Sequence, residues 1–370
     1  MPKVYVVTSV HKRYDVRIFY KQCRTLSKAG YEVNLIVQDG EGPEILDGVN
    51  IYDIGHPFGN RLYRIILSPL KMYNFLKKSS ADIIHLHDPE LLPAGFFLKR
   101  KNFRVIYDSH EDFPRQILSK HWIYPALRKF VSFLFEKIEN RIAKKLDAVI
   151  GATPFIAARF KPINQISIDI NNYPLLGEFD CVLKNTEESF SRTFCYIGAI
   201  TRERGISQVV EAVNLLQNVT LVMCGPFESE SYSKELQVMP GWRFVDYRGI
   251  VDRDEVSQIM ASSQAGVVTF LPGPNHNESQ PNKMFEYMAA GLPLIASHFP
   301  LWKQIVEKNQ CGICVNPGSP EEIARAITSL LDDQKLAETM GKAGKNAVTH
   351  NLNWENEAVK LVNIYSQIAG

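Results

Sequence analysis

Two absences in this sequence limit what the protein can be. No run of 18 or more apolar residues occurs among the 370 residues, so no membrane-spanning helix is expected. The beginning of the chain reads as a strand and lacks the basic and apolar segments of a signal peptide. The net charge is only +2, whereas nucleic-acid-binding domains are strongly basic, so nucleic acid is not an expected partner.

Cysteine is also scarce. Six cysteines are spread along the chain, and only Cys311 and Cys314 are spaced as a Cys-x-x-Cys pair. A zinc site would normally need a second pair or nearby histidines, and neither stands beside this pair in the sequence. Several of the cysteines lie in apolar, strand-like runs, so we expect buried, reduced thiols and a cytoplasmic protein.

What the sequence has in quantity is an alternation of strand and helix patterns. Hydrophobic residues make up 45% of the chain, enough for a core in each of about two domains. Apolar β-branched runs such as 4–9 alternate with helical segments such as 18–29, which predicts α/β domains with parallel sheets. A polar, acidic and aperiodic segment at 175–192 interrupts the pattern. We therefore expect two doubly wound domains, at residues 1–174 and 193–350, joined by a linker.

The stretch 276–293 is the most informative part of the chain. Pro281 is suited to the first turn of a helix, and Ser279, just before it, could cap the free amides. We therefore predict a helix over residues 281–290 that ends near Gly291. The start of such a helix offers unpaired N–H groups and a positive dipole end to an anion, which predicts a phosphate site.

Charged side chains surround this predicted helix start. Lys283 lies in the first turn, Glu278 in the preceding loop and Glu286 one to two turns into the helix. This layout suits a ligand with a phosphate at the helix start and hydroxyl groups on both sides. A nucleotide sugar has that shape.

A second basic loop lies between an apolar strand and a helix. It runs from Gly198 to Gly205 and carries Arg202 and Arg204. A glycine-bounded basic loop in this position predicts a phosphate cradle, and a guanidinium can bind a phosphate through two parallel hydrogen bonds. For Arg202, a solvated surface turn is an equally good interpretation.

The motif Glu278-x7-Glu286, followed by Tyr-Met-Ala-Ala-Gly-Leu-Pro, resembles the signature of glycosyltransferase family 4, the group 1 glycosyltransferases. The resemblance covers nearly the whole chain and implies a GT-B fold, in which two Rossmann-like domains face each other across a cleft. It also implies that the last helix, in residues 351–370, packs back on the N-terminal domain. In one departure from the family loop, Ala199 replaces an arginine and Arg204 replaces a lysine, so Arg204 inherits the diphosphate-binding role.

The resemblance also implies roles for individual residues. Glu286 would hold the ribose hydroxyls, Glu278 those of the donor sugar, and His110 would contact the sugar or the reaction centre. The donor-binding residues are then Gly198, Arg202, Arg204, Gly249, Pro281, Asn282, Lys283 and Glu286, with His110 and Glu278 as the catalytic residues. Because basic side chains would neutralise the leaving diphosphate, neither a metal nor another cofactor is expected.

The N-terminal half carries further candidates where strands end, because ligands of open parallel sheets bind at the carboxyl ends of the strands. The loop after the first strand contains His11, Asp15 and Arg17 and lacks a glycine-rich turn, so we expect it to contact the acceptor. For His11 alone, a place in a surface loop is equally plausible. Glu111, beside His110, could orient that histidine or bind the acceptor.

Two other patterns raise the question of a metal. His85 and His87 would point to the same face of a strand, so two metal ligands are sterically feasible. We favour packing for one and a loop position for the other. Asp252-Arg-Asp254 has the Asp-x-Asp form of some metal-dependent glycosyltransferases, but it precedes a helix, which favours an N-cap.

Two segments, 61–78 and 121–145, are both basic and rich in apolar residues. The second begins with His121 and Trp122 and contains several phenylalanines. Such helices can lie on an anionic membrane surface. Alternatively, their apolar faces belong to the core and their basic faces are merely solvated. For 121–145 we slightly favour membrane contact.

These observations favour a retaining, metal-independent glycosyltransferase. It would move a sugar from a nucleotide-diphosphate sugar to a saccharide acceptor that is lipid-linked, as in surface polysaccharide or lipopolysaccharide synthesis, at the inner face of the cell membrane. A soluble acceptor remains open. Two alternatives are a sugar-nucleotide 2-epimerase of the same fold and a non-catalytic nucleotide-sugar-binding protein.

Overall fold

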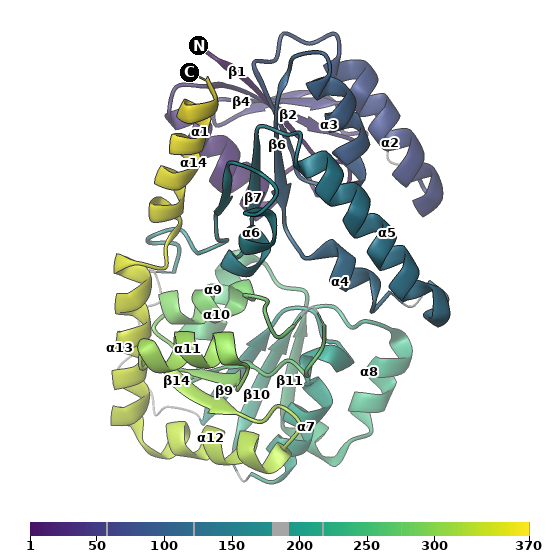
Figure 1. Cartoon of the computed structure of the whole chain (residues 1–370). Helices are drawn as coiled ribbons and strands as arrows, with labels where there is room; N and C mark the ends of the chain where they lie inside the picture. Colours follow the sequence, from purple (N-terminus) through teal and green to yellow (C-terminus); the bar gives the residue numbers. More distant parts are fainter. Residues whose placement is uncertain (57, 121–122, 180–191, 217, 275, 370) are drawn as a thin grey trace. The chain divides into compact units, whose positions relative to one another are not determined.

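The computed structural model of the chain describes residues 1–56, 58–120, 123–179, 192–216, 218–274 and 276–369 (Figure 1). It divides into two compact units. Unit 1 consists of Met1–Asn172 together with the chain from Trp354 onward, and unit 2 consists of Tyr173–Asn353. Of the predicted linker, residues 180–191 lie outside the described residues, as do Cys181, His121 and Trp122.

Unit 1 is built on an eight-stranded sheet with the order β3-β4-β2-β1-β5-β6-β7-β8. Its strands are β1 Lys3–Val7, β2 Glu32–Val37, β3 Glu44–Leu46, β4 Val49–Asp53, β5 Ile83–Leu86, β6 Arg104–Ser109, β7 Ala148–Gly151 and β8 Ser167–Asp169. Every pair is parallel except β3 with β4. The strand order reverses between β1 and β5, and the crevice at such a reversal is where ligands bind in open sheets.

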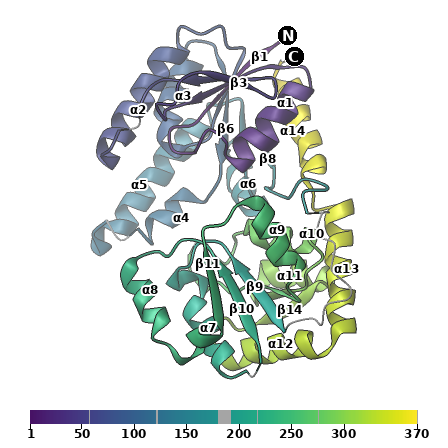
Figure 2. The ribbon, with the colours of Figure 1, turned by 180° about the vertical axis from the view of Figure 1, so that it is seen from behind.

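The helices of unit 1 follow the alternation that the sequence predicts. They are η1 Val16–Cys23, α1 Arg24–Lys28, α2 Arg61–Leu76, η2 Pro89–Leu91, α3 Leu92–Lys99, α4 Phe113–Ile117, α5 Pro125–Ala143, α6 Pro154–Phe160 and α14 Trp354–Ala369. The helix expected over 18–29 begins earlier, as the π-helix η1 capped by Asp15, and continues as α1. Figure 2 shows α14 beside α1. The indole N–H of Trp354 donates to the hydroxyl of Thr25 at 2.9 Å.

Unit 2 has a six-stranded sheet with the order β11-β10-β9-β12-β13-β14. Its strands are β9 Thr193–Ile197, β10 Thr220–Cys224, β11 Val245–Gly249, β12 Gly266–Val268, β13 Leu294–Ser297 and β14 Gly312–Val315, and their pairings are parallel. The reversal of strand order falls between β9 and β12. Alternate residues of β9 pack into different hydrophobic cores, Cys195 on one face of the sheet and Phe194 and Tyr196 on the other. Because both faces are buried, such strands appear in the sequence as continuous apolar runs.

Helices cover both faces of the unit 2 sheet. They are η3 Arg202–Arg204, α7 Ile206–Asn214, α8 Glu230–Gln237, η4 Pro240–Phe244, α9 Arg253–Ala261, α10 Asn282–Ala289, α11 Pro300–Lys308, α12 Pro320–Asp332 and α13 Gln334–His350. The helix predicted over 281–290 is α10. Cys311 is buried, Cys314 is half-buried, and both are free thiols. Across the residues that the structure describes, none of the helices combines the length and the apolar character needed to cross a bilayer.

Candidate functional site

Two loops of unit 2 leave the sheet on either side of the strand-order reversal. One follows β9 and leads through Gly198 and η3 into α7, and the other follows β12 and leads into α10. Chain segments that are about 80 residues apart in the sequence are therefore brought together where a doubly wound sheet binds ligands. Both segments were predicted from the sequence to bind phosphate.

Gly198, Arg204 and Lys283 converge at this point. A Cβ atom on Gly198 would lie 2.8 Å from the Lys283 amine and 3.4 Å from a terminal nitrogen of Arg204. Gly198 also has a φ of +129°, a backbone angle that L-residues with a side chain rarely adopt. The guanidinium of Arg204 donates to the carbonyl oxygen of Ala199 at 3.1 Å. The glycine thus lets the Lys283 amine approach the backbone closely, beside the guanidinium of Arg204.

The Lys283 amine is an unusual group for a protein interior. The residue is only 7% exposed, and its Nζ has no hydrogen-bond partner among the described residues. It lies 3.7 Å from the ring centroid of Tyr196, a cation–π contact. Burial, followed by the nearby charge of Arg204, lowers the pKa of Lys283 well below its ordinary value. Because buried charges are normally paired, the geometry fits an anion that supplies the missing partner.

Glu286, one turn further along α10, is half-buried and carries an ion pair. Its Oε1 lies 3.2 Å from a terminal nitrogen of Arg253, the first residue of α9. Arg253 is also paired with Glu178. Asp252 caps α9 by accepting a hydrogen bond from the amide of Glu255 at 2.9 Å, as the sequence predicts. The pairing of Glu286 with Arg253 was not expected, because only the fold brings α9 beside α10.

The loop before α10 is fixed by its backbone. The indole N–H of Trp302 donates to the carbonyl oxygen of Ser279 at 2.6 Å. The Ser279 hydroxyl donates to the carbonyl oxygen of His276 at 2.8 Å and does not cap the helix, so the capping prediction was wrong. The N-cap residue is Pro281, which has no capping side chain. The first amides of α10, beginning at Asn282, are therefore free of a side-chain cap, and Glu278 is half-buried in this loop.

Two predicted donor-binding residues, Arg202 and Gly249, do not join the group formed by Gly198, Arg204 and Lys283. Arg202 turns to the surface, where it forms ion pairs with Glu235 and Glu228. Its guanidinium also lies 4.4 Å from the ring centroid of Tyr232. Gly249 ends β11 with a φ of +72°. The structure therefore favours Arg204 over Arg202 as a phosphate ligand, and it shows no contact of Gly249 with the basic pair.

Unit 1 has its own polar cluster at the carboxyl ends of β1, β5 and β6. His11 lies 3.5 Å from Asp15 through Nδ1 and 3.5 Å from Asp88 through Nε2. Burial alone would lower the pKa of His11, but the hydrogen bond to Asp15 and the charge of Asp88 outweigh it, so that pKa is raised. The His11 ring also contacts the ring of His110, with the centroids 4.7 Å apart.

Arg17 lies deeper in unit 1 than the sequence predicts. It is 4% exposed and donates to both carboxylate oxygens of Asp108, at 2.9 and 3.2 Å, and to the carbonyl oxygen of Ile170. Burial would raise the pKa of Asp108, but Arg17 outweighs that effect and holds it at about 2. Arg17 therefore fixes Asp108, and this position disfavours the acceptor contact predicted for it.

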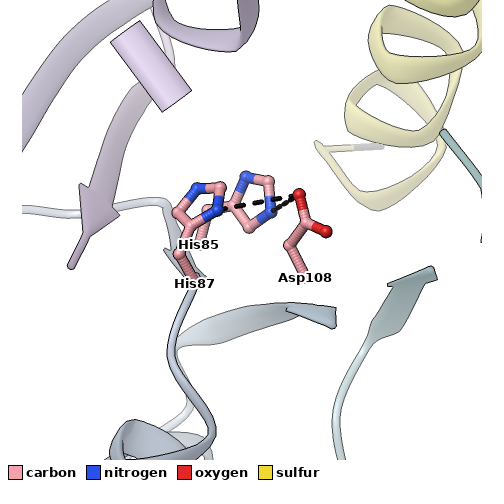
Figure 3. A group of neighbouring side chains, drawn as sticks. All are labelled: His85, His87 and Asp108. Carbon is pink, nitrogen blue, oxygen red and sulfur yellow. Dashed lines mark ion pairs between the residues drawn. The ribbon is translucent and has the colours of Figure 1, made fainter. Parts of the chain in front are cut away.

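Three histidines surround the same carboxylate. Figure 3 shows the rings of His85 and His87 directed at Asp108. His85 Nε2 is 3.8 Å and His87 Nδ1 is 3.7 Å from Asp108 Oδ2, and His110 Nε2 is 3.9 Å from it. His87 Nδ1 also lies 3.0 Å from His110 Nε2, a hydrogen bond. His85 in β5 and His87 in the loop directly after it are thus both buried; the loop position of His87 agrees with the sequence interpretation, which expected packing of only one of the two.

These separations would suit a metal ion, because His85, His87 and Asp108 each offer one ligand atom. The charge balance does not favour one. Asp108 is already paired with the buried cation of Arg17, and a divalent ion beside it would add repulsion in a poorly solvated environment. We interpret the cluster as a hydrogen-bonded network, and the absence of a bound metal stays a prediction.

His110 is the member of the network that reaches solvent, with 17% of its side chain exposed. Burial lowers the pKa of His110 to about 3, so the ring is neutral at physiological pH. Glu111 is exposed, and its carbonyl oxygen accepts a hydrogen bond from Ser109 at 3.1 Å. The neighbour that holds His110 is therefore His87 and not Glu111, and the alternative interpretation of Glu111, contact with the acceptor, stays a prediction.

Comparison with known families agrees with these features. The family model described as Glycosyltransferase Family 4 matches residues 16–167, and the model described as Glycosyl transferases group 1 matches residues 184–347. Together the two matches cover most of both units. The chain belongs to the group 1 glycosyltransferases of family 4, and it is an enzyme of the glycosyltransferase class.

Curated relatives are distant but extend over most of the chain. An uncharacterized glycosyltransferase of Methanocaldococcus jannaschii is 27% identical over 364 residues, which are 92% of this chain and 90% of that protein. The capsular polysaccharide biosynthesis glycosyltransferase CapM of Staphylococcus aureus is 22% identical, with 95% of each chain covered. A second M. jannaschii glycosyltransferase, 23% identical, is matched over 64% of this chain and only 63% of its own length.

Solved structures share the fold. Sucrose-phosphate synthase of Thermosynechococcus elongatus superposes with a TM-score of 0.77 at 18% identity, covering 100% of this chain and 99% of that chain. HepE of Anabaena, solved in complex with UDP-glucose, gives a TM-score of 0.74 at 14% identity, with 99% of both chains covered. The fold predicted from the sequence, two parallel-sheet α/β domains of the GT-B type, is confirmed.

Proposed function

We propose that this enzyme transfers a sugar from a nucleotide-diphosphate sugar to a saccharide hydroxyl, with retention of anomeric configuration and without a metal. The observation that carries the proposal is the buried Lys283 amine, which has no partner among the described residues and lies beside Gly198 and Arg204. A diphosphate placed there would pair with both cations. The complex of the Anabaena neighbour with UDP-glucose supports a ligand of this chemistry.

The same residues would stabilise the reaction as well as binding. Negative charge grows on the diphosphate as the glycosidic bond breaks, and fixed positive groups in a poorly solvated site stabilise such charge strongly. Three such groups are held in place at this site: Lys283, Arg204 and the uncapped amides at the start of α10. Glu286 would hold the ribose hydroxyls and Glu278 those of the donor sugar. The leaving phosphate would assist removal of the acceptor proton on the same face, the route to retention that the family resemblance implies.

For the acceptor we propose a lipid-linked saccharide at the cytoplasmic face of a membrane, in surface polysaccharide or lipopolysaccharide synthesis. The function of the capsular polysaccharide relative supports the polysaccharide part. The exposed side of α5 supports the lipid part, because it carries Leu127, Phe130, Phe133, Leu134 and Ile138. Basic residues also lie on α5. The two acidic residues of this helix form ion pairs with Arg115 and Arg159 and not with those basic residues.

The test is turnover of a panel of nucleotide sugars with lipid-linked and free saccharides, with EDTA present. NMR of the product gives the anomeric configuration, and an inverted product would refute retention. Glu286→Ala should lower kcat/KM by at least about a hundredfold, a loss of ~2.7 kcal/mol of transition-state stabilisation. Near-normal turnover in that variant would refute the ribose assignment. Epimerisation of the donor without acceptor would favour the 2-epimerase, and binding without any turnover would favour a non-catalytic protein.

A further inference from the structure

His87 is conspicuous because it has no assigned part in the reaction and yet contacts His110, the histidine that the family resemblance implies is catalytic. It follows β5 directly and its side chain is fully buried. Its Nδ1 lies 3.0 Å from Nε2 of His110, and the two rings meet edge to face with their centroids 5.2 Å apart. No other described side chain forms a hydrogen bond with His110.

We propose that His87 is a positioning residue, which fixes the ring orientation and the tautomer of His110 so that His110 presents its Nδ1–H to the donor sugar. This inference rests on the proposed role of His110. The two nitrogens of a neutral imidazole differ, and the hydrogen bond made by one decides which carries the proton. With Nε2 held by His87, only Nδ1 of His110 remains for a ligand.

The direction of the hydrogen bond follows from the other nitrogen of His87. Its Nε2 is buried and has no hydrogen-bond partner among the described residues. If His110 donated to His87, the proton of His87 would sit on that nitrogen as a buried donor without an acceptor. Orphaned N–H groups are rarer in proteins than orphaned acceptors. His87 Nδ1–H therefore donates to His110 Nε2, and the proton of His110 lies on Nδ1.

The surroundings of His87 hold this arrangement in place. Asp108 Oδ2 lies 3.7 Å from Nδ1 of His87 and 3.9 Å from Nε2 of His110, so this carboxylate lies beside both nitrogens of the hydrogen bond. Asp108 is itself fixed by Arg17 and by the side-chain amide of Gln22, which donates to it at 2.7 Å. On the other side, the His85 ring packs against His87 with the centroids 4.4 Å apart, and His85 is held by the hydroxyl of Tyr365 at 2.8 Å.

The test compares two substitutions of equal size, His87→Asn and His87→Leu. An asparagine amide can donate from near the position of Nδ1, whereas leucine cannot donate. We expect His87→Leu to lower kcat about tenfold to a hundredfold, the scale of a misplaced contact group. The KM for the nucleotide sugar should change less than about twofold. A raised KM with unchanged kcat would instead indicate the loss of a contact that binds substrate and transition state equally. His87→Asn should recover most of the rate. The matched control is Ile84→Val, a change in the buried apolar core of β5 on the sheet face opposite His85, which should leave kcat unchanged.

A second readout reports the tautomer directly. In the wild-type enzyme labelled with 15N-histidine, NMR should show the proton of His110 on Nδ1, and in His87→Leu a mixture of tautomers. A wild-type proton on Nε2 would overturn the proposal even if His87→Leu did not fold. Full activity of His87→Leu, in a protein whose His110→Ala variant is inactive, would also overturn it. If His110→Ala itself is fully active, the proposed role of His110 fails instead.

Discussion

Replacing Lys283 with methionine should make the unliganded protein more stable and its nucleotide binding weaker. Methionine keeps the length of the side chain and removes the amine, which is buried without a partner among the described residues. Because burial already lowers the pKa of Lys283, the wild-type protein tolerates a poorly solvated amine that has no hydrogen bond to offset its burial among the described residues. Removing it should raise the free energy of unfolding by about 1–2 kcal/mol, the usual range for such substitutions.

The effect on binding should be opposite and larger. A hydrogen bond to a charged group contributes about 1.5–3 kcal/mol, so the dissociation constant for the nucleoside diphosphate should rise by about tenfold to a hundredfold. At a nucleotide concentration of a hundred times the wild-type dissociation constant, binding stabilises the wild type by ~2.7 kcal/mol. At a hundredfold weaker affinity the same concentration would stabilise Lys283→Met by only ~0.4 kcal/mol.

The assay is thermal or denaturant unfolding of both proteins, with and without the nucleotide. Lys303→Met, a change at an exposed lysine on α11, is the matched control and should leave both quantities as in the wild type. The wild-type affinity should also fall as pH rises, because a bound diphosphate favours the protonated form of Lys283, and Lys283→Met should lose that dependence. A less stable variant that still binds nucleotide normally would show that the Lys283 amine neither destabilises the unliganded protein nor holds the diphosphate.

Three further predictions concern Gly198, the buried histidines of unit 1 and the exposed side of α5. Gly198→Ala should abolish nucleotide binding, measured by calorimetry, because the new Cβ would lie 2.8 Å from the Lys283 amine at a φ of +129°; unchanged affinity would contradict the cradle. Burial lowers the pKa of His85 to about 4 and that of His110 to about 3, both below the unfolded value, so the unfolded chain binds more protons between about pH 6.5 and 4. Stability should therefore fall as the pH is lowered through this range, with a shallower slope in His85→Leu; equal slopes in urea titrations would count against burial of a neutral ring. Finally, the double substitution of Phe130 and Phe133 by serine should reduce flotation with anionic liposomes at low salt and leave nucleotide binding intact. A wild-type protein that fails to float would contradict the proposed membrane contact.

The sequence predicted that Gly198, Arg204 and Lys283 meet, because this convergence depends on chain order. Gly198 and Arg204 follow β9, and Lys283 follows β12, and strand ends at the reversal of a doubly wound sheet must meet. The basic character of both loops was visible in the sequence. The burial of Lys283 was not, because it depends on the ring of Tyr196 and the sheet around it.

The pairings between distant elements could not be predicted from one sequence. Arg17 and Asp108 are 91 positions apart, and their contact depends on the order of β1, β5 and β6 in the sheet. His85 lies in β5 and His87 directly after it, two positions apart as the alternation of extended chain requires for a common direction, but their common partner, Asp108, comes from β6. The ion pair of Arg253 with Glu286 depends in the same way on the packing of α9 beside α10.

The most direct test is calorimetric titration of the wild-type protein with UDP, GDP, dTDP and ADP, each with and without EDTA. We predict saturable binding that is selective for one base, is unaffected by EDTA and is lost in Glu286→Ala. If none of the four nucleotides binds, the basic site formed by Gly198, Arg204 and Lys283 is not a nucleotide-diphosphate site, and the proposed donor chemistry is wrong.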